Sequence, residues 1–276
     1  MNYERLDIQQ FGQHLLETND LDPVYVALVA QSWSGETLRR WLIAYWCFYH
    51  CGVASWLAEH ESMSFWAGMI EAARNVNCPV GERWPRGRER RHFRGAQAIM
   101  AIEELCLAYP NQPERMVDWI AMAAPSYIEV AERVRTHRGF GPWISFKIAD
   151  MIERVLGIHI NFETAHVFMF KDPQKAALML WSQHHGGARP KDPQLAVRQV
   201  VDHLLKVFNA YKAPPRGDRA IGLQEVETIL CCWKSHMNGH YPLYNDQVEI
   251  NTGLIPWLGY SKLAGDFHRA MPKRSE

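Results

Sequence analysis

Apolar residues recur at helical spacing along almost the whole chain, and this periodicity constrains the fold more than any other feature. The strongest example runs from Thr37 to Ala58; it is apolar nearly all round and predicts a central core helix. Asp20 and Asp22 before Pro23 mark another helix start, and Ile158–Phe162 is the only notable strand-like alternation. We therefore expect an all-α fold. Further helices are expected at Met63–Asn75, Gly95–Ala108, Pro113–Ala123, Tyr127–Thr136, Trp143–Leu156, Asp172–Gln183, Pro193–Ala210 and Leu223–His236.

The composition says more about where in the cell the protein is located than about its function. The 276 residues carry 30 Lys and Arg against 30 Asp and Glu, so net charge alone makes no case for a nucleic-acid partner. No apolar run approaches the 18 or so residues that a membrane span needs. The first residues, MNYERLDIQQFGQHLLE, are amphipathic and unlike a signal peptide. We expect a cytoplasmic protein without a membrane partner.

Cysteine and histidine spacing gives no metal signature. The six cysteines form no CxxC pair and lack the four-cysteine spacing of an iron–sulfur cluster, and the thirteen histidines show no HExxH or similar pattern. Cys47 and Cys51 stand four residues apart on the expected core helix. They either share a ligand or are two small buried side chains. We predict no metal and no cofactor.

Local charge is more informative than net charge. Residues 81–95, GERWPRGRERRHFRG, hold six arginines against two glutamates. Such a patch is sufficient to contact phosphates even on a neutral protein, although it is also compatible with a solvated surface.

The segment Tyr127–Phe162 predicts a helical hairpin. The first helix ends near Thr136, a Gly-x-Gly turn follows at Gly139 and Gly141, and Pro142 opens the next helix. Glycines permit a tight turn and close approach of a ligand, and the free amides of a helix start can hold a phosphate oxygen. A plain αα-hairpin is the alternative interpretation.

Two helices carry further polar candidates. On the hairpin's second helix, Lys147, Asp150 and Arg154 share one face, either as solvated ion pairs or as residues lining a cleft. The late segment ETILCCWKSHMNGHYPLYND combines polar donors with aromatic residues, as expected where a base stacks and phosphates are held. Lys234 and His236 lie near a helix end, where cations are also favourable without any binding role. Tyr241, Tyr244 and Asp246 are expected on the following loop.

GFGPW between two amphipathic helices resembles the helix-hairpin-helix of the DNA glycosylase superfamily. That resemblance implies one glycosylase-like domain over residues 1–276, with two helical lobes, a cleft between them and the hairpin at about 127–157. In this superfamily a catalytic aspartate follows the hairpin. Glu163 of NFETAHVF occupies that place, and its longer side chain departs from the pattern.

Five segments resemble a narrower phage family, the alpha-glutamyl/putrescinyl thymine pyrophosphorylases or amino acid:DNA transferases, and also the helical domain of phage 5-hydroxymethyluracil DNA kinases. They span about residues 15 to 246. The segments are LETNDLDPVYVAL, RRWLIAYWCFYHCGVA, WPRGRERRHFRG, GFGPWISFKIADMIERVLG and WKSHMNGHYPLYND.

The resemblance implies that an amine of an amino acid or polyamine displaces pyrophosphate from 5-(pyrophosphoryloxymethyl)uracil in double-stranded phage DNA, inside the infected bacterium. Arginines suit the leaving group, a base must deprotonate the incoming ammonium, and the modified base must flip out. Glu163 or Asp246 is expected as base or ammonium anchor, Lys234 as a leaving-group contact, and Lys147 and Asp150 as site residues. DNA and phosphate contacts are expected from Arg86, Arg88, Arg90, Arg91, His92, Arg94, Gly139, Gly141, Trp143, His236 and Tyr241.

Two other functions fit the same motifs. A base-excision glycosylase would use Glu163, although Trp143 stands where bifunctional glycosylases carry lysine. A non-catalytic DNA-docking module would serve a hydroxymethyluracil DNA kinase in trans, because this chain has no GxxxxGK[ST] loop of its own.

Overall fold

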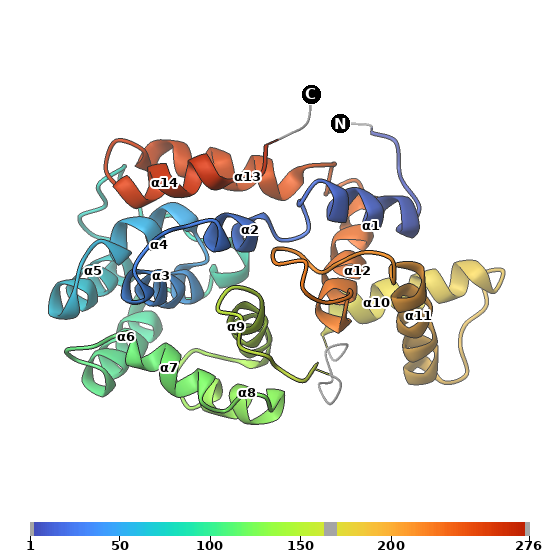
Figure 1. Cartoon of the computed structure of the whole chain (residues 1–276), viewed down its shortest axis with the longest axis horizontal. Coiled ribbons are helices and arrows are strands. Elements are labelled where there is room, and N and C mark those ends of the chain that lie inside the picture. The colour runs from blue at the N-terminus through green and yellow to red at the C-terminus, as the bar shows by residue number, and fades with distance from the viewer. Residues whose placement is uncertain (1–2, 163–169, 274–276) are drawn as a thin grey trace. The chain divides into compact units, whose positions relative to one another are not determined.

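A computed structural model of the chain describes residues 3–162 and 170–273 (Figure 1). These residues confirm the all-α prediction: they form helices and no strand, and β pairing among them is limited to isolated bridges such as that between Lys212 and Ala220. No described helix is long and apolar enough to cross a membrane. The helices are α1 (Ile8–Glu17), α2 (Pro23–Val29), α3 (Gly35–Phe48), α4 (Cys51–Ala58), α5 (Ser62–Arg74), α6 (Gly95–Ala108), α7 (Arg115–Ala121), α8 (Tyr127–Arg135), α9 (Pro142–Arg154), α10 (Lys171–His184), α11 (Pro193–Val207), α12 (Leu223–Met237), α13 (Asn245–Leu254) and α14 (Lys262–Ala270), with 3-10 turns η1 (Arg88–Arg90) and η4 (Ile255–Trp257).

The chain divides into two compact units. Unit 1 comprises Met1–Val26, Asn161–Gln247 and Pro272–Glu276. In it α10 packs against α11 and α12, and α1 packs against α12. Its core gathers aromatic and aliphatic side chains from all four helices, among them Phe11, Leu180, Leu204 and Trp233.

Unit 2 comprises Ala27–Ile160 and Val248–Met271. It pairs α3 with α4, α5 with α6, and α8 with α9, and α14 covers α4. Trp41, Trp46, Trp66 and Trp257 are completely buried in it, which accounts for much of the chain's unusual tryptophan content. Each such side chain removes a large apolar surface from water.

The core helix expected over Thr37–Ala58 is instead two helices, α3 and α4. Tyr49 ends α3 in the left-handed region with φ 52°, and the side chain of His50 then caps α4 by accepting the N–H of Val53 at 3.3 Å. A separate cap and a left-handed residue allow two buried helices to meet at a corner. Cys47 and Cys51 therefore lie on different helices; both are buried free thiols whose pKa burial raises.

The alternating stretch Ile158–Phe162 forms no strand, and the N–H of Ile160 is donated to the carboxylate of Glu153 at 3.3 Å. One other local expectation was wrong. The sequence after Tyr244, expected as a loop, begins α13, and Asp246 stands in the first turn of that helix.

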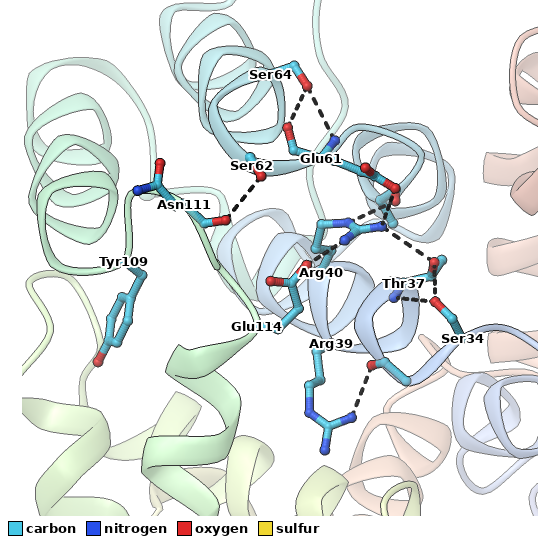
Figure 2. A network of polar contacts seen from close by, with 12 residues as sticks. Ser34, Thr37, Arg39, Arg40, Glu61, Ser62, Ser64, Tyr109, Asn111 and Glu114 are labelled. Carbon is cyan, nitrogen blue, oxygen red and sulfur yellow. Dashed lines mark hydrogen bonds and ion pairs between the residues drawn. The ribbon is translucent and has the colours of Figure 1, made fainter.

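A buried arginine organises the start of unit 2 (Figure 2). Arg40 on α3 pairs with Glu114 before α7, and it also donates to the carbonyl of Ala58 at 3.2 Å and lies 3.9 Å from Glu61 before α5. Its side chain is 5% exposed and that of Glu114 is 13% exposed. Four helices thus share one guanidinium whose charge is compensated away from water.

We expect Arg40→Ala to lower the free energy of unfolding by about 3 to 5 kcal/mol, because Glu114 would remain buried without its counterion. The matched control is Arg39→Ala on the same helix, whose pair with Asp118 is largely exposed and contributes about 1 kcal/mol or less. Denaturant titration of both variants measures this difference. Equal losses would contradict the role given to Arg40.

Acid should weaken unit 2 through His50. Burial lowers the pKa of its imidazole from 6.5 to about 4, so the folded protein binds fewer protons than the unfolded chain between those values. Stability should therefore fall as pH drops from 6.5 to 4, by up to about 3 kcal/mol from this residue. His50→Asn, which can still cap α4 but does not titrate, should flatten that part of the stability–pH curve. An unchanged slope in the variant would contradict this account.

Candidate nucleic-acid interface and acidic cluster

The predicted hairpin is present in unit 2 as α8, a tight turn and α9 (Figure 1). Gly139 adopts φ 78°, Gly141 is the N-cap of α9, and Pro142 occupies its first turn. A Cβ placed on Gly141 would meet nothing within 4 Å, so the backbone here faces open space. The turn presents a helix start, where the first amides lack an intrahelical acceptor and can bind a phosphate oxygen.

The arginine segment packs directly on this turn. Arg90 donates to the carbonyl of Gly139 at 3.0 Å and to that of Cys47 at 3.2 Å. Its guanidinium carbon lies 4.3 Å from the ring centroid of Phe93 and 5.3 Å from that of Phe140. A Cβ on Gly139 would come within 2.9 Å of Phe93, so glycine is needed there for the contact as well as for its φ. Two motifs separated by about fifty residues thus form one surface.

Arg86 and Arg90 serve the fold rather than a phosphate. Arg86 donates to the carbonyls of Ala72 at 2.8 Å and Phe93 at 2.9 Å, and Arg90 is 1% exposed. Burial lowers the pKa of Arg90 to about 10. Their predicted phosphate contacts are therefore corrected, because Arg86 uses its guanidinium on backbone carbonyls and the guanidinium of Arg90 is buried inside unit 2, its Nη2 without a partner among the described residues.

The remaining predicted phosphate ligands are exposed. Arg88, Arg91, His92 and Arg94 lie at the surface of the segment that Arg90 anchors. Arg88 has 79% of its side chain exposed and makes a weak 3.7 Å contact to Glu249. Their phosphate contacts stay a prediction. These four exposed side chains, Arg88, Arg91, His92 and Arg94, form what we call the arginine edge, beside the start of α9.

Trp143, just inside α9, is half-buried and lies edge-on to Tyr49 with ring centroids 5.3 Å apart. Its predicted DNA contact also stays a prediction, and so do those of the Gly139 and Gly141 backbone.

The charged face of α9 is buried rather than solvated. Lys147 is 8% exposed, Asp150 is fully buried, and Arg154 is 3% exposed. Asp150 and Arg154 approach to 3.5 Å. Solvated ion pairs, one of the two interpretations of the sequence, are therefore excluded. Buried charged side chains occur where they form ion pairs or belong to a functional site. Lys147 and Asp150 therefore stay candidate site residues.

In unit 1, the imidazole of His236 joins two backbone segments by hydrogen bonds. Its Nε2 accepts the N–H of Leu6 at 3.0 Å, and Nδ1 donates to the carbonyl of Tyr241 at 2.7 Å. Burial lowers its pKa, which favours the neutral ring that can accept from Leu6. The predicted DNA contact of His236 is corrected, since the imidazole is completely buried and both nitrogens are used.

Lys234, two residues earlier on α12, forms an ion pair with Asp172 of α10. The lysine lowers the pKa of Asp172 below its ordinary value. Lys234 remains partly exposed at 21%, so a role toward a leaving group requires exchange of this partner.

An acidic cluster in unit 1 was not anticipated in full. Asp20, read from the sequence only as a helix-start signal, is completely buried and accepts the N–H of Gln247 at 3.0 Å. Asp246, predicted with Glu163 as base or ammonium anchor, is half-buried, and its charge raises the pKa of Asp20. Tyr241 and Cys232 are neighbours in the same cluster, and each influences the pKa of the other. Tyr241 is only 8% exposed, so its predicted place on a DNA-facing loop is corrected.

Glu163 lies outside the described residues. Among the residues that the structure does describe, no three His, Cys, Asp or Glu side chains gather as metal ligands would.

Comparison with known proteins identifies the family. The sequence profile of the family described as "Amino acid:DNA transferase" matches residues 13–240, most of the chain. The chain belongs to this amino acid:DNA transferase family. It is 48% identical over 286 aligned positions to a protein of Pseudomonas phage PaMx11 named glycinyltransferase, covering 99% of this chain and 98% of that protein. It is 25% identical to a putrescinyltransferase of Delftia phage PhiW-14, covering 95% and 82%.

If the arginine edge holds the DNA backbone, single Arg88→Ala, Arg91→Ala and Arg94→Ala variants should bind duplex DNA more weakly. Each should also reduce the slope of log K against log salt by about one. Arg115→Ala, an exposed arginine on α7, is the matched control and should leave both quantities unchanged. Fluorescence anisotropy over a salt series measures them. A slope unaffected by all three substitutions would remove the edge from the interface.

Proposed function

We propose that this chain transfers an amino acid, with glycine as the first candidate, to pyrophosphorylated 5-hydroxymethyluracil in phage DNA. The observation that carries the proposal is its 48% identity to a phage glycinyltransferase along essentially the full length of both proteins. Similarity to a putrescinyltransferase makes a polyamine the second donor to test. A DNA kinase of the same phage would supply the phosphorylated substrate, because this chain lacks a P-loop.

The reaction is a substitution at the methylene carbon on C5 of the uracil ring. The incoming ammonium first loses a proton to a base, because only the free amine has a lone pair for attack. A C–N bond then forms as the C–O bond to pyrophosphate breaks, and the bonding electrons leave with pyrophosphate. Cations near the leaving oxygens stabilise the developing charge.

Residues of the described structure support these tasks. The α9 helix start with Arg88, Arg91, His92 and Arg94 would grip phosphates of the strand, and flipping would bring the modified base within reach. The arginine edge gives the hairpin a charged flank, which favours the helix-hairpin-helix interpretation over a plain αα-hairpin. Asp246 or Glu163 would take the proton, and Lys234 would contact the leaving group. Lys147 and Asp150 of α9 remain candidate site residues without an assigned step.

The test is nucleoside mass analysis of DNA carrying 5-(pyrophosphoryloxymethyl)uracil after incubation with the protein and glycine. We expect a new nucleoside heavier by the glycine increment over thymidine, together with release of pyrophosphate. Parallel reactions with putrescine and with a mixture of other amino acids define the donor. Release of free base would instead establish a glycosylase, and unchanged nucleosides with every donor would refute transfer.

A further inference from the structure

Asp20 is built into unit 1 as a buried acceptor with one oxygen left over. Its Oδ1 accepts the N–H of Gln247 at 3.0 Å, and the backbone of Tyr244 and Asn245 at the same turn opposes the rise in its pKa. It therefore fixes the start of α13, where Asp246 stands. Its Oδ2 is buried and has no hydrogen-bond partner among the described residues. A buried carboxylate oxygen without a hydrogen-bond donor lowers the stability of the fold, unless a bound group supplies the donor.

A second buried polar group points to the same place. Tyr241 is 8% exposed, and its hydroxyl also lacks a conventional partner in the described part of the chain; its polar neighbour is the thiol of Cys232, a weak hydrogen-bond partner. Asp246 and Asp20 both act electrostatically on this hydroxyl. The two unsatisfied atoms and the half-buried Asp246 thus converge from the α1–α2 connection, the loop after α12 and the start of α13.

The charges of this cluster favour a cation. No lysine or arginine of the described residues pairs with Asp20; the groups that act on its carboxyl are Asp246 and the backbone at the start of α13. Other titratable groups of the described residues that face the cluster are Asp22, Cys231 and Cys232, and His14 stacks edge-on against Tyr244 at 4.7 Å. Burial raises the pKa of Asp20 to about 7, and Asp246 adds to that rise. The carboxyl group of Asp20 is consequently neutral below about pH 7 and negatively charged above it.

We propose that Asp20, Asp246 and Tyr241 form the pocket that receives the primary ammonium group of the donor amine. This deepens the proposed function and rests on it. Asp246, at the accessible side, contacts the ammonium and takes its first proton; after C–N bond formation the second proton leaves to water. Asp20 is a positioning residue that holds the α13 start and completes the negative charge. The Tyr241 hydroxyl accepts a hydrogen bond from the same ammonium.

The experiment measures binding of glycine without DNA, by calorimetry, across pH 5.5 to 8.5. Glycine keeps its ammonium protonated through this range, so a change in affinity reports the protein. We expect affinity to rise through about pH 7 in the wild type and this rise to disappear in Asp20→Asn, which still accepts the α13 amides. Asp246→Asn should weaken binding by about tenfold or more. Asp202→Asn, an exposed acid on α11, is the control and should bind as wild type.

A retained unfolding midpoint distinguishes loss of the pocket from loss of the fold. Should Asp20→Asn unfold, Tyr241→Phe provides the second test, because it removes only the hydroxyl and should weaken glycine binding in a folded protein. Wild-type affinity and pH dependence in folded Asp20→Asn, Asp246→Asn and Tyr241→Phe would overturn the proposal. Because binding is measured apart from transfer, the two proposals can fail separately. If the variants lose glycine binding but the wild type forms no DNA product, the pocket stands and the reaction is refuted. The converse would keep the reaction and refute the pocket.

Discussion

The candidate nucleic-acid surface depends on one buried guanidinium. Arg90 reaches from the arginine segment to the carbonyls of Cys47 and Gly139, and lies against the rings of Phe93 and Phe140. A buried cation with no carboxylate in contact is held by carbonyl dipoles and aromatic faces, so its position is specific rather than merely attractive. Together with Arg86, which donates to the carbonyls of Ala72 and Phe93, it fixes the exposed arginines beside the hairpin turn.

In unit 1, too, buried polar side chains join distant segments through hydrogen bonds to the backbone. His236 ties Leu6 to the loop at Tyr241, and Tyr3 donates to the carbonyl of His236 at 3.0 Å, so the first residues are bound to the end of α12. Asp20 then attaches the α1–α2 connection to the start of α13. Segments more than two hundred residues apart are thereby ordered around the acidic cluster. Apolar packing alone would fix the relative positions of these segments less precisely than these hydrogen bonds do, because apolar contacts are not directional.

Local sequence rules succeeded where local chemistry decides. Gly141 and Pro142 placed the start of α9, and Gly95 and Ala108 bounded α6 correctly. The rules failed where burial overrode them. The run from Thr37 to Ala58 reads as one helix because its apolar content does not reveal the left-handed Tyr49 or the capping role of His50. Tertiary packing of α4 against α3 and α14 selected the break.

The sequence by itself determined the all-helical class, the hairpin, the presence of a local arginine excess and the family, because helical periodicity, turn chemistry and motif order are written along the chain. It did not determine which arginines face inward or that Asp20 joins Asp246. Arg90 and Arg91 are neighbours with the same chemistry, yet one is buried and the other exposed. Only the tertiary structure decided this, because burial, and with it charge and hydrogen-bond partners, is set by segments distant in sequence.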